Sequence, residues 1–508
     1  MSARIKVFLT IVILTIGISL PYILAARSAG EGYVFGGFLV NPLDGNSYLA
    51  KMQQGLAGQW EFSLTYSPQG GGGAYIFLFY IFLGHLAGWT GLPLLLVFHL
   101  ARLLASIGLL VVLWRFFRWL AKDDLDLAWK MFLLAAIGSG LGWLAAIFTG
   151  YLSGDFWIAE TFPFLSMYTN PHFPLGLALM LSACLLVFNR SVRYRLLLAA
   201  LVSVALAVVQ PFGVVVLVLP LAGYFLFHPE RLRTSDLPAV LLAVVPRGPD
   251  LIYPYLAITA DPILSLWNAQ NLTASPPAWD LALSLSPALL LAAVGGYWAL
   301  KVPNQRMNLL SFWLVAGVLL VFVPFSLQRR FMSGMYIPVA GLAGYAIYRL
   351  ASRHVRMKWI WPATLAFSLL TNLLLIAGGV GAAARQDPAL YLTRGESAAL
   401  AWLEGNTPLR SVILASPDIG VYIPAWSGRS VVYGHPFESI HAQKAREDVE
   451  AYFSGAMSDA QAREFFADQG IAYVFRGPRE EALGVPRNLS ELAPVFEEGD
   501  VTIYEVNR

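Results

Sequence analysis

The chain has 508 residues, of which 57% are hydrophobic and only 13% are charged, and its mean hydropathy is +0.62. About a quarter of the residues in a soluble protein are charged, so the composition excludes an ordinary soluble globular protein. A net charge of +3 without a basic tract argues against nucleic acid as a partner. The single cysteine, Cys184, excludes an internal disulfide and a thiolate metal cluster.

Charge is distributed unevenly along the chain. Residues 1–380 contain 23 Lys and Arg and 13 Asp and Glu, whereas the much shorter stretch 381–508 contains 11 and 18. This contrast predicts a transmembrane body over residues 1–380 and a soluble domain over residues 381–508.

Eleven apolar stretches are candidates for membrane-spanning helices, each of which needs roughly 20 apolar residues. The first resembles a signal peptide but has no convincing small-residue cleavage site, so we expect it to be retained as an anchor. The body is thus predicted to be a polytopic α-helical membrane protein. The expected spans are 7–26, 94–114, 128–150, 171–188, 196–209, 212–228, 237–258, 281–300, 308–327, 332–350 and 359–380.

The distribution of Lys and Arg predicts the orientation in the plasma membrane. Residues 75–89 are read as a helix along the outer interface, because counting them as a span would place a basic cluster outside. Seventeen Lys and Arg then fall in cytoplasmic segments, and four, Arg27, Lys51, Arg329 and Arg330, fall outside. The N-terminus is therefore expected in the cytoplasm and the C-terminal domain outside it. Function is expected on the long outer loops 27–93, 151–170 and 259–280.

The first outer loop contains Asp44 just before an amphipathic stretch, with Tyr48 one helical turn later. A carboxylate is stabilised at the start of a helix by the helix dipole. The residues alone leave two roles open for Asp44: capping a helix over residues 46–55, or chemistry.

The second outer loop offers Asp155 and Glu160, which could hold a divalent cation or remain a solvated pair. Asn170, His172 and Gln210 lie near predicted helix ends, where polar groups should face a polar cavity or one another. His172 is open between a structural role and that of a ligand or a base. Gln210 and Pro211 form the turn of a predicted helical hairpin.

Arg329 and Arg330 are adjacent at the outer mouth of a predicted span, against the trend of the other cations. The guanidinium group matches phosphate oxygens and keeps its charge. We favour binding of a lipid-linked phosphate over simple contact with membrane lipids. Arg102 and Arg247 lie inside apolar runs and need carboxylate, carbonyl or water partners.

Several motifs are absent from the sequence, including the Gly-x-Ser-x-Gly elbow, the His-Glu-x-x-His zinc motif and the phosphate-binding Gly-x4-Gly-Lys loop. The run Gly70 to Gly73 is read as a flexible joint. Nucleotide chemistry on the inner face is therefore unsupported.

The C-terminal stretch predicts a small extracytoplasmic α/β domain in which helices alternate with strands. A capping box at Thr393 and Glu396 begins a helix that should end at Gly405. Further helices are expected near 439–453 and from Ser458 to Gly470. Strands are expected at 411–415, 431–433, 471–475 and 501–506. Six side chains could meet a sugar or simply support the fold, and none is assigned to catalysis: Asp418, Tyr422, Trp426, Arg429, His435 and His441.

The order of these parts resembles the GT-C superfamily of integral-membrane glycosyltransferases. The residues that carry the resemblance are Asp44 to Gly55, Tyr75 to Gly88 and Arg102, with the second acidic loop and Tyr168 to Pro174 in addition. The C-terminal domain is similar to the soluble extracytoplasmic domain that many members append.

The resemblance implies a hexosyl- or pentosyltransferase that moves a sugar from a polyprenyl-phosphate-linked donor to a glycan, lipid or protein acceptor. Asp44 would be the general base, and Arg329 and Arg330 would stabilise the departing phosphate. Tyr48, Arg102, Asn170 and Gln210 would support the site. Many members have an acidic pair where Gly45 follows Asp44 here, so no cofactor is implied with certainty and Mg²⁺ or Mn²⁺ stays open.

Two alternatives remain at this point. A glycolipid transporter or flippase usually shows internal repeats, and we find none. A non-catalytic membrane protein that binds glycan through its outer domain is the other alternative.

Overall fold

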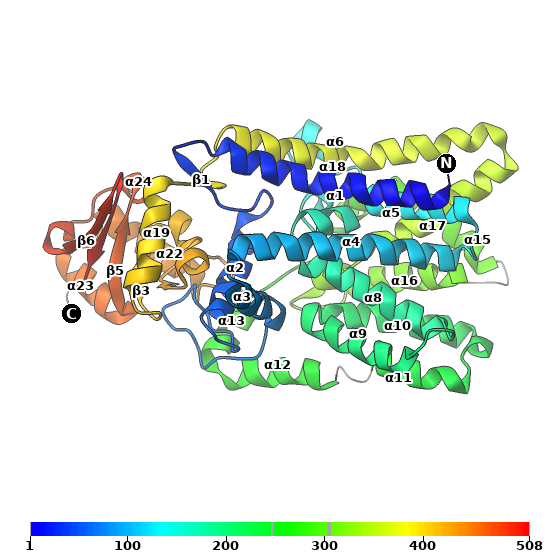
Figure 1. The fold of residues 1–508 in the computed structure, drawn as a ribbon, viewed down its shortest axis with the longest axis horizontal. Coiled ribbons are helices and arrows are strands. Elements are labelled where there is room, and N and C mark those ends of the chain that lie inside the picture. Colours follow the sequence, from blue (N-terminus) through cyan, green and yellow to red (C-terminus); the bar gives the residue numbers. More distant parts are fainter. Residues whose placement is uncertain (1, 245–247, 302–305, 507–508) are drawn as a thin grey trace. The chain divides into compact units, whose positions relative to one another are not determined.

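The computed structural model describes residues 2–244, 248–301 and 306–506, and its fold is mostly helical (Figure 1). The chain divides into two compact units, and each is described by itself. The first unit comprises Met1–Pro21, His99–Ile252 and Leu272–Gly379. The second comprises Tyr22–Phe98, Tyr253–Asn271 and Val380–Arg508, so two of the outer loops pack with the C-terminal residues.

Every predicted span coincides with one helix or with a pair of helices. The predicted span 237–258 includes residues 245–247, which lie outside the described residues. The helices concerned are α1 (Ala3–Ser28), α4 (Leu94–Leu120), α5 (Leu125–Ile137), α6 (Gly142–Thr149), α8 (His172–Phe188), α9 (Arg195–Val209), α10 (Phe212–Phe227), α11 (Leu237–Val244), α12 (Gly248–Ala260), α14 (Ala278–Leu285), α15 (Ala288–Lys301), α16 (Arg306–Val321), α17 (Tyr336–Arg353) and α18 (Ile360–Ala384). The tight hairpin at Gln210 and Pro211 is confirmed, because α9 ends at Val209 and α10 begins at Phe212.

Fewer helices than eleven are long and apolar enough to cross a membrane on their own. Within the described ranges, four segments meet that standard: Ala3–Ser28, Leu94–Leu120, Leu125–Thr149 and Val355–Ala384. A fifth is possible if α14 and α15, which meet at 86°, are counted as one span. The number of eleven crossings therefore stays a prediction.

Helix α17 lies at the centre of the first unit, where it packs against α5, α15 and α16. Its residues from Tyr336 to Gly344 are all buried. The contact with α15 is close because Gly295 lacks a side chain, and a Cβ there would clash with the carbonyl oxygen of Leu342. Shorter elements connect the helices of this unit: η1 (Gly154–Phe156), α7 (Pro163–Tyr168), η2 (Pro229–Arg231), η3 (Thr234–Asp236), η5 (Gln328–Met332) and η6 (Val355–Trp359).

The second unit begins with residues 22–98, which include the expected first outer loop and fold around α2 (Pro42–Leu56) and α3 (Leu78–Thr90). The two helices cross closely because each has a glycine at the contact. A Cβ on Gly55 would clash with the Ile81 carbonyl oxygen, and one on Gly84 would clash with that of Met52. Helix α13 (Pro262–Gln270), from the third predicted outer loop, also belongs to this unit.

The C-terminal residues form a mixed five-stranded sheet in the order β4-β3-β5-β7-β6. Strands β4, β3 and β5 are parallel, and β7 runs antiparallel to both β5 and β6. The elements are β3 (Val412–Leu414), β4 (Ser430–Val431), β5 (Ile471–Arg476), β6 (Ala493–Glu498) and β7 (Val501–Glu505), with α19 (Arg394–Asn406), α20 (Pro417–Gly420), α21 (Ile423–Ser427), α22 (Ala442–Phe453), α23 (Asp459–Gln469), α24 (Pro478–Glu481) and η7 (Leu489–Glu491).

Local signals in the C-terminal sequence predicted the three longer helices, α19, α22 and α23. Thr393 and Glu396 form the expected capping box, although α19 continues past Gly405 to Asn406. Ser458 and Gln461 form a second capping box at the start of α23. The helix ends at Gln469, and the next residue, Gly470, adopts the left-handed conformation. The sequence analysis missed the short helices α20, α21 and α24 and strand β6. It also missed a separate two-stranded sheet that pairs β1 (Tyr33–Phe35) with β2 (Tyr391–Thr393) antiparallel.

Candidate functional site

Asp44 lies in the first turn of α2, one of whose faces carries a row of polar side chains. Asn41, not Asp44, is the N-cap residue: its side-chain oxygen accepts the Asp44 backbone N–H. Its amide also donates to Asp44 Oδ2 at 2.7 Å, which orients the carboxylate. Of the two roles left open for Asp44, capping is not what the structure shows, because Asn41 caps the helix and Pro42 begins it about one turn before residue 46.

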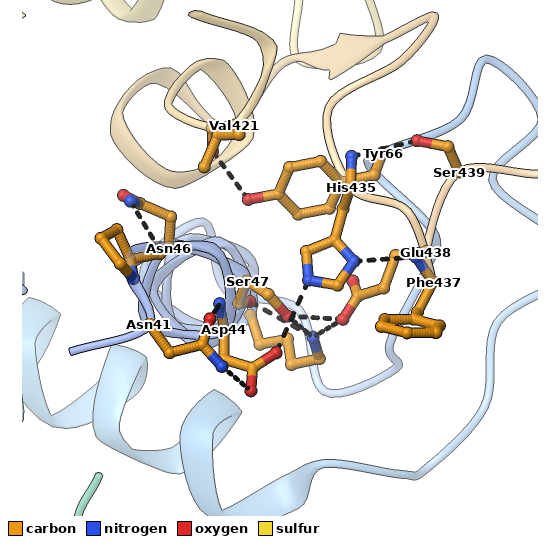
Figure 2. A network of polar contacts seen from close by, with 12 residues as sticks. Asn41, Asp44, Asn46, Ser47, Tyr66, Val421, His435, Phe437, Glu438 and Ser439 are labelled. Atoms are coloured by element: carbon orange, nitrogen blue, oxygen red, sulfur yellow. Dashed lines mark hydrogen bonds and ion pairs between the residues drawn. The ribbon is translucent and has the colours of Figure 1, made fainter. Parts of the chain in front are cut away.

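His435 faces Asp44 from the loop that follows β4, and Figure 2 shows the two side chains pointing toward one another. The imidazole Nε2 lies 3.7 Å from Asp44 Oδ1. Its Nδ1 accepts the Phe437 backbone N–H at 3.1 Å, which in the neutral ring leaves the proton on Nε2, toward Asp44. The Ser439 hydroxyl accepts the backbone N–H groups of Gly434 and His435 and so closes this loop. The imidazole is therefore fixed and aimed at the carboxylate.

Lys51 and Glu438 form a buried ion pair beside Asp44. Lys51 Nζ lies 2.7 Å from Glu438 Oε1, which also accepts the Ser47 hydroxyl proton. Burial would raise the pKa of Glu438, but the Lys51 charge, His435 and the two hydrogen bonds hold that pKa below its usual value. Because Lys51 is neutralised by Glu438, its charge does not cancel that of Asp44.

Asp44, Ser47 and Lys51 lie three and four residues apart, so they share one face of α2. Tyr48 stacks on Tyr80 of α3, with ring centroids 4.3 Å apart, and braces the helix from another side. The Asp44 side chain is 43% exposed, whereas that of His435 is 4% exposed. The arrangement thus presents one oriented, accessible carboxylate on a rigid support. An arrangement of this kind can accept a proton from a bound hydroxyl group.

The first unit brings Arg329 and Arg330 to the carboxylate of Glu160. The shortest separations are 3.8 Å for Arg329 and 3.7 Å for Arg330, and the Glu160 side chain is 4% exposed. The Arg329 guanidinium also lies 4.9 Å from the centre of the Trp157 ring. Two cations face one anion, so this cluster keeps a net positive charge.

Gln210 supports the arginine pair through Ser333. The Gln210 amide donates to the Ser333 hydroxyl at 2.7 Å, and that hydroxyl donates to the carbonyl oxygen of Arg330 at 2.9 Å. The carbonyl oxygen of Glu160 accepts the Gly334 backbone N–H. Sequence positions 160, 210 and 330 therefore meet in one network, and Gln210 has a polar partner in Ser333.

Arg102, for which the sequence predicts carboxylate, carbonyl or water partners, has carbonyl partners. Its guanidinium donates to the carbonyl oxygens of Ile18, Met167 and Tyr168 at 3.0 to 3.3 Å, which ties α4 to α1 and α7. Asn170 and His172 are buried where α8 begins, and the His172 ring lies 3.9 Å from that of Phe173. Arg247 lies outside the described residues.

Asp155 and Glu160 engage different partners, although they were considered together as ligands of a cation. Asp155 is fully buried and accepts the backbone N–H groups of Gly140 and Gly142. Burial raises its pKa to about 6, against the lowering effect of hydrogen bonds from Thr371 and these two glycines. No group of three or more His, Cys, Asp or Glu side chains gathers anywhere in the described part of the chain.

The side chains around Asp44 were largely missed by reasoning from the sequence. His435 was considered only as a possible sugar contact, and Lys51 and Glu438 were not singled out. The spacing of Asp44, Ser47 and Lys51 along one helical face was the available signal. Two other candidate contacts serve the fold: Tyr422 donates its hydroxyl to the Ala389 carbonyl, and Arg429 donates to carbonyl groups of Ser427 and Glu404.

No protein-family model matches the sequence, and no curated protein matches it either. Solved structures do match. The ArnT protein of Cupriavidus metallidurans bound to undecaprenyl phosphate is 13% identical, with 97% of each chain covered and a TM-score of 0.53.

Two other solved structures match with a TM-score of 0.50. The oligosaccharyltransferase of Archaeoglobus fulgidus is 14% identical, and the match covers 92% of this chain and 67% of that one. The arabinofuranosyltransferase AftD from Mycobacteria is 15% identical, and the match covers all of this chain and 40% of that one. These neighbours are GT-C glycosyltransferases. At such identities the likeness establishes the fold alone: the chain is a multi-pass membrane protein with the GT-C glycosyltransferase fold.

Proposed function

We propose that the protein is a glycosyltransferase that moves a sugar from a polyprenyl-phosphate-linked donor to an acceptor hydroxyl group on the outer face of the plasma membrane. The observation that carries this proposal is the oriented, accessible carboxylate of Asp44, held by Asn41 and faced by His435. The GT-C fold supports it, since the ArnT structure that matches over nearly its whole length contains undecaprenyl phosphate.

Asp44 acts as the general base. Its carboxylate takes the proton of the acceptor hydroxyl as that oxygen attacks the anomeric carbon of the donor. The bond between the anomeric carbon and the phosphate oxygen breaks, the electron pair leaves with the polyprenyl phosphate, and the configuration inverts. General-base assistance is typically worth about 10² to 10⁴-fold in rate.

Arg329 and Arg330 bind the donor phosphate. Their two charges exceed the single charge of Glu160, and guanidinium groups suit phosphate oxygens. As the donor breaks, negative charge grows on the phosphate, and fixed cations stabilise that charge.

Substitution of Asp44 with Asn tests the proposal, because it keeps the shape of the side chain and removes the base. Transfer of a radiolabelled sugar from a polyprenyl-phosphate donor should fall by about 10² to 10⁴-fold, with donor affinity unchanged. Asp459→Asn is the matched control, because Asp459 is an exposed acidic side chain in the first turn of α23, in the same unit. Full transfer by the Asp44→Asn protein would rule out the general base.

A further inference from the structure

A cleft of about 610 Å³ opens in the second unit, away from the site described above. One wall consists of residues 53–75, from the end of α2 to the start of the segment before α3. The other consists of residues 404–430, around the end of α19 and α21. Trp60, Glu61 and Tyr75 project from the first wall, and Glu404 and Arg410 from the second; all five are exposed. The general base and phosphate-binding roles use none of them.

Trp60 provides a fixed aromatic surface in this cleft. Its ring stacks on His85 of α3, with centroids 4.0 Å apart, and the His85 Nε2 lies 2.9 Å from the carbonyl oxygen of Gln59. The residue nevertheless stays 44% exposed. A large side chain that is already held in place loses little conformational entropy when a ligand packs on it. The apolar C–H face of a sugar ring is a ligand of matching shape.

The polar groups of the cleft suit hydroxyl groups better than an ion. Glu61 accepts a hydrogen bond from the Tyr75 hydroxyl, and this bond raises the pKa of Tyr75. The two carboxylates, Glu61 and Glu404, are balanced by two guanidinium groups, Arg410 and the buried Arg429. A cleft without net charge does not select an anion or a cation. The two carboxylates supply acceptors, and the exposed Arg410 supplies donors, for a ligand that has many hydroxyl groups. Arg429 contributes only its charge, because its guanidinium already donates to Thr407, Ser427 and Glu404.

Helix α2 connects this cleft to Asp44 within the same unit. Gln53 and Gln54, at the C-terminal end of α2, line the cleft, and Asp44 is in the first turn. Nine residues of α-helix separate Asp44 from Gln53, which is about 14 Å along the axis. A ligand in the cleft is therefore too far from Asp44 to be the reacting hydroxyl group itself. An extended chain of sugars can occupy both places.

We infer that the cleft is a distal subsite for a neutral oligosaccharide acceptor. In this subsite Trp60 packs on a sugar ring, and Glu61 and Glu404 accept hydrogen bonds from sugar hydroxyl groups. The inference rests on the proposed glycosyl transfer and names the class of acceptor. Binding energy gained here is present before and during the reaction, so the subsite lowers KM and leaves kcat unchanged.

Calorimetric titration of the full-length protein in detergent with defined probes tests the inference. The probes are a linear neutral hexose tetrasaccharide, a linear pentose tetrasaccharide and a tetrapeptide of Ser and Gly. At least one tetrasaccharide should bind, and Trp60→Ala should weaken that binding about tenfold. Trp60→Phe, which keeps a ring, should weaken it less. Trp359→Ala, at an exposed tryptophan of the other unit, is the control and should change nothing.

Three outcomes overturn the subsite: neither tetrasaccharide binds, the Trp60→Ala protein binds as the wild type does, or the tetrapeptide binds in preference. Loss of Glu61 and Glu404 in a double Gln variant should also weaken sugar binding, and an unchanged affinity counts against their role. Asp44→Asn should bind the tetrasaccharide normally. Sugar binding together with full transfer by that variant would remove the base from the proposed function and leave the subsite in place. Loss of transfer by that variant, with no tetrasaccharide bound by the wild type, would overturn the subsite and keep the base, so the two failures are distinguishable.

Discussion

The imidazole of His435 presents its Nε2 to the Asp44 carboxylate at 3.7 Å, although 391 positions separate the two residues in the sequence. The first outer loop and the C-terminal domain each contribute one of them. Two consequences follow for experiment. The carboxylate depends on both segments for its position, and the C-terminal domain takes part in the site.

We predict that His435 acts as a positioning residue for Asp44. His435→Ala removes the N–H that faces the carboxylate, and kcat for sugar transfer should fall about tenfold, while KM for the donor is unchanged. His435→Gln places an amide N–H in the same region and should restore most of the rate. His354→Ala, at an exposed histidine of the other unit, is the control. A purely structural role would lower the melting temperature and would not separate Ala from Gln.

We predict that substitutions in the cluster of Arg329, Arg330 and Glu160 change the affinity for polyprenyl phosphate in opposite directions. Replacement of both Arg329 and Arg330 with Ala should weaken binding of polyprenyl phosphate in detergent by about 10 to 100-fold, because two charge-assisted contacts are lost. Glu160→Gln should strengthen the same binding, because it removes the anion that competes for these cations. Arg353→Ala, on α17, is the control. Equal affinities in the wild type and both variants would show that the phosphate of the donor does not bind at this site.

The buried pair of Lys51 and Glu438 should be sensitive to the loss of one partner. Lys51→Met leaves the Glu438 carboxylate buried without its cation, and the free energy of unfolding should fall by about 3 to 5 kcal/mol. The double variant Lys51→Met with Glu438→Gln removes both charges and should recover most of that loss. The measurement is thermal unfolding of the full-length protein. Equal melting temperatures in the single and double variants would contradict the coupling.

Stability of the C-terminal sheet should fall as pH rises from about 4.5 to about 7 and should level off above that. Burial raises the pKa of Glu480 to about 7, although Ser416 and Gly477 donate hydrogen bonds to the carboxylate. The native state therefore holds a proton that the unfolded chain has released, and the free energy of unfolding decreases between about pH 4.5 and 7.

Hydrogen exchange of β3 and β5 in the full-length protein, corrected for intrinsic rates, measures this dependence. Glu480→Gln should remove it and stabilise the sheet at pH 8 by on the order of 3 kcal/mol. The neighbouring Glu481 is an exposed matched control, and Glu481→Gln should retain the wild-type dependence.

Elements with a local signal could be predicted from the sequence. Thr393 with Glu396, and Ser458 with Gly470, mark the ends of α19 and α23 to within about a residue, because capping is a contact between near neighbours. Strand β6 was missed because it lies at an edge of the sheet, is mostly exposed and contains Pro494. The pairing of β1 with β2 was missed because it joins residues more than 350 positions apart. Each strand has only three residues, which is too short for a sequence pattern that specifies a partner.

The same limit applies to the candidate site. Asp44 was found because a carboxylate at a helix start is a local feature. The Lys51–Glu438 contact joins positions 387 apart. Nothing in the sequence distinguishes Lys51 from the other cations of the expected outer loops. The roles of Asp44 and of the arginine pair remain predictions.

Pairing of β1 with β2 means that the C-terminal domain is not a detachable module. Removal of residues after 380 would leave an unpaired strand at residues 33–35 and would strip Lys51 of its counterion. A chimaera that replaces the C-terminal domain with that of another protein would also have to replace residues 22–98, because both belong to one compact unit. The two segments are therefore expected to be inherited and exchanged as a set.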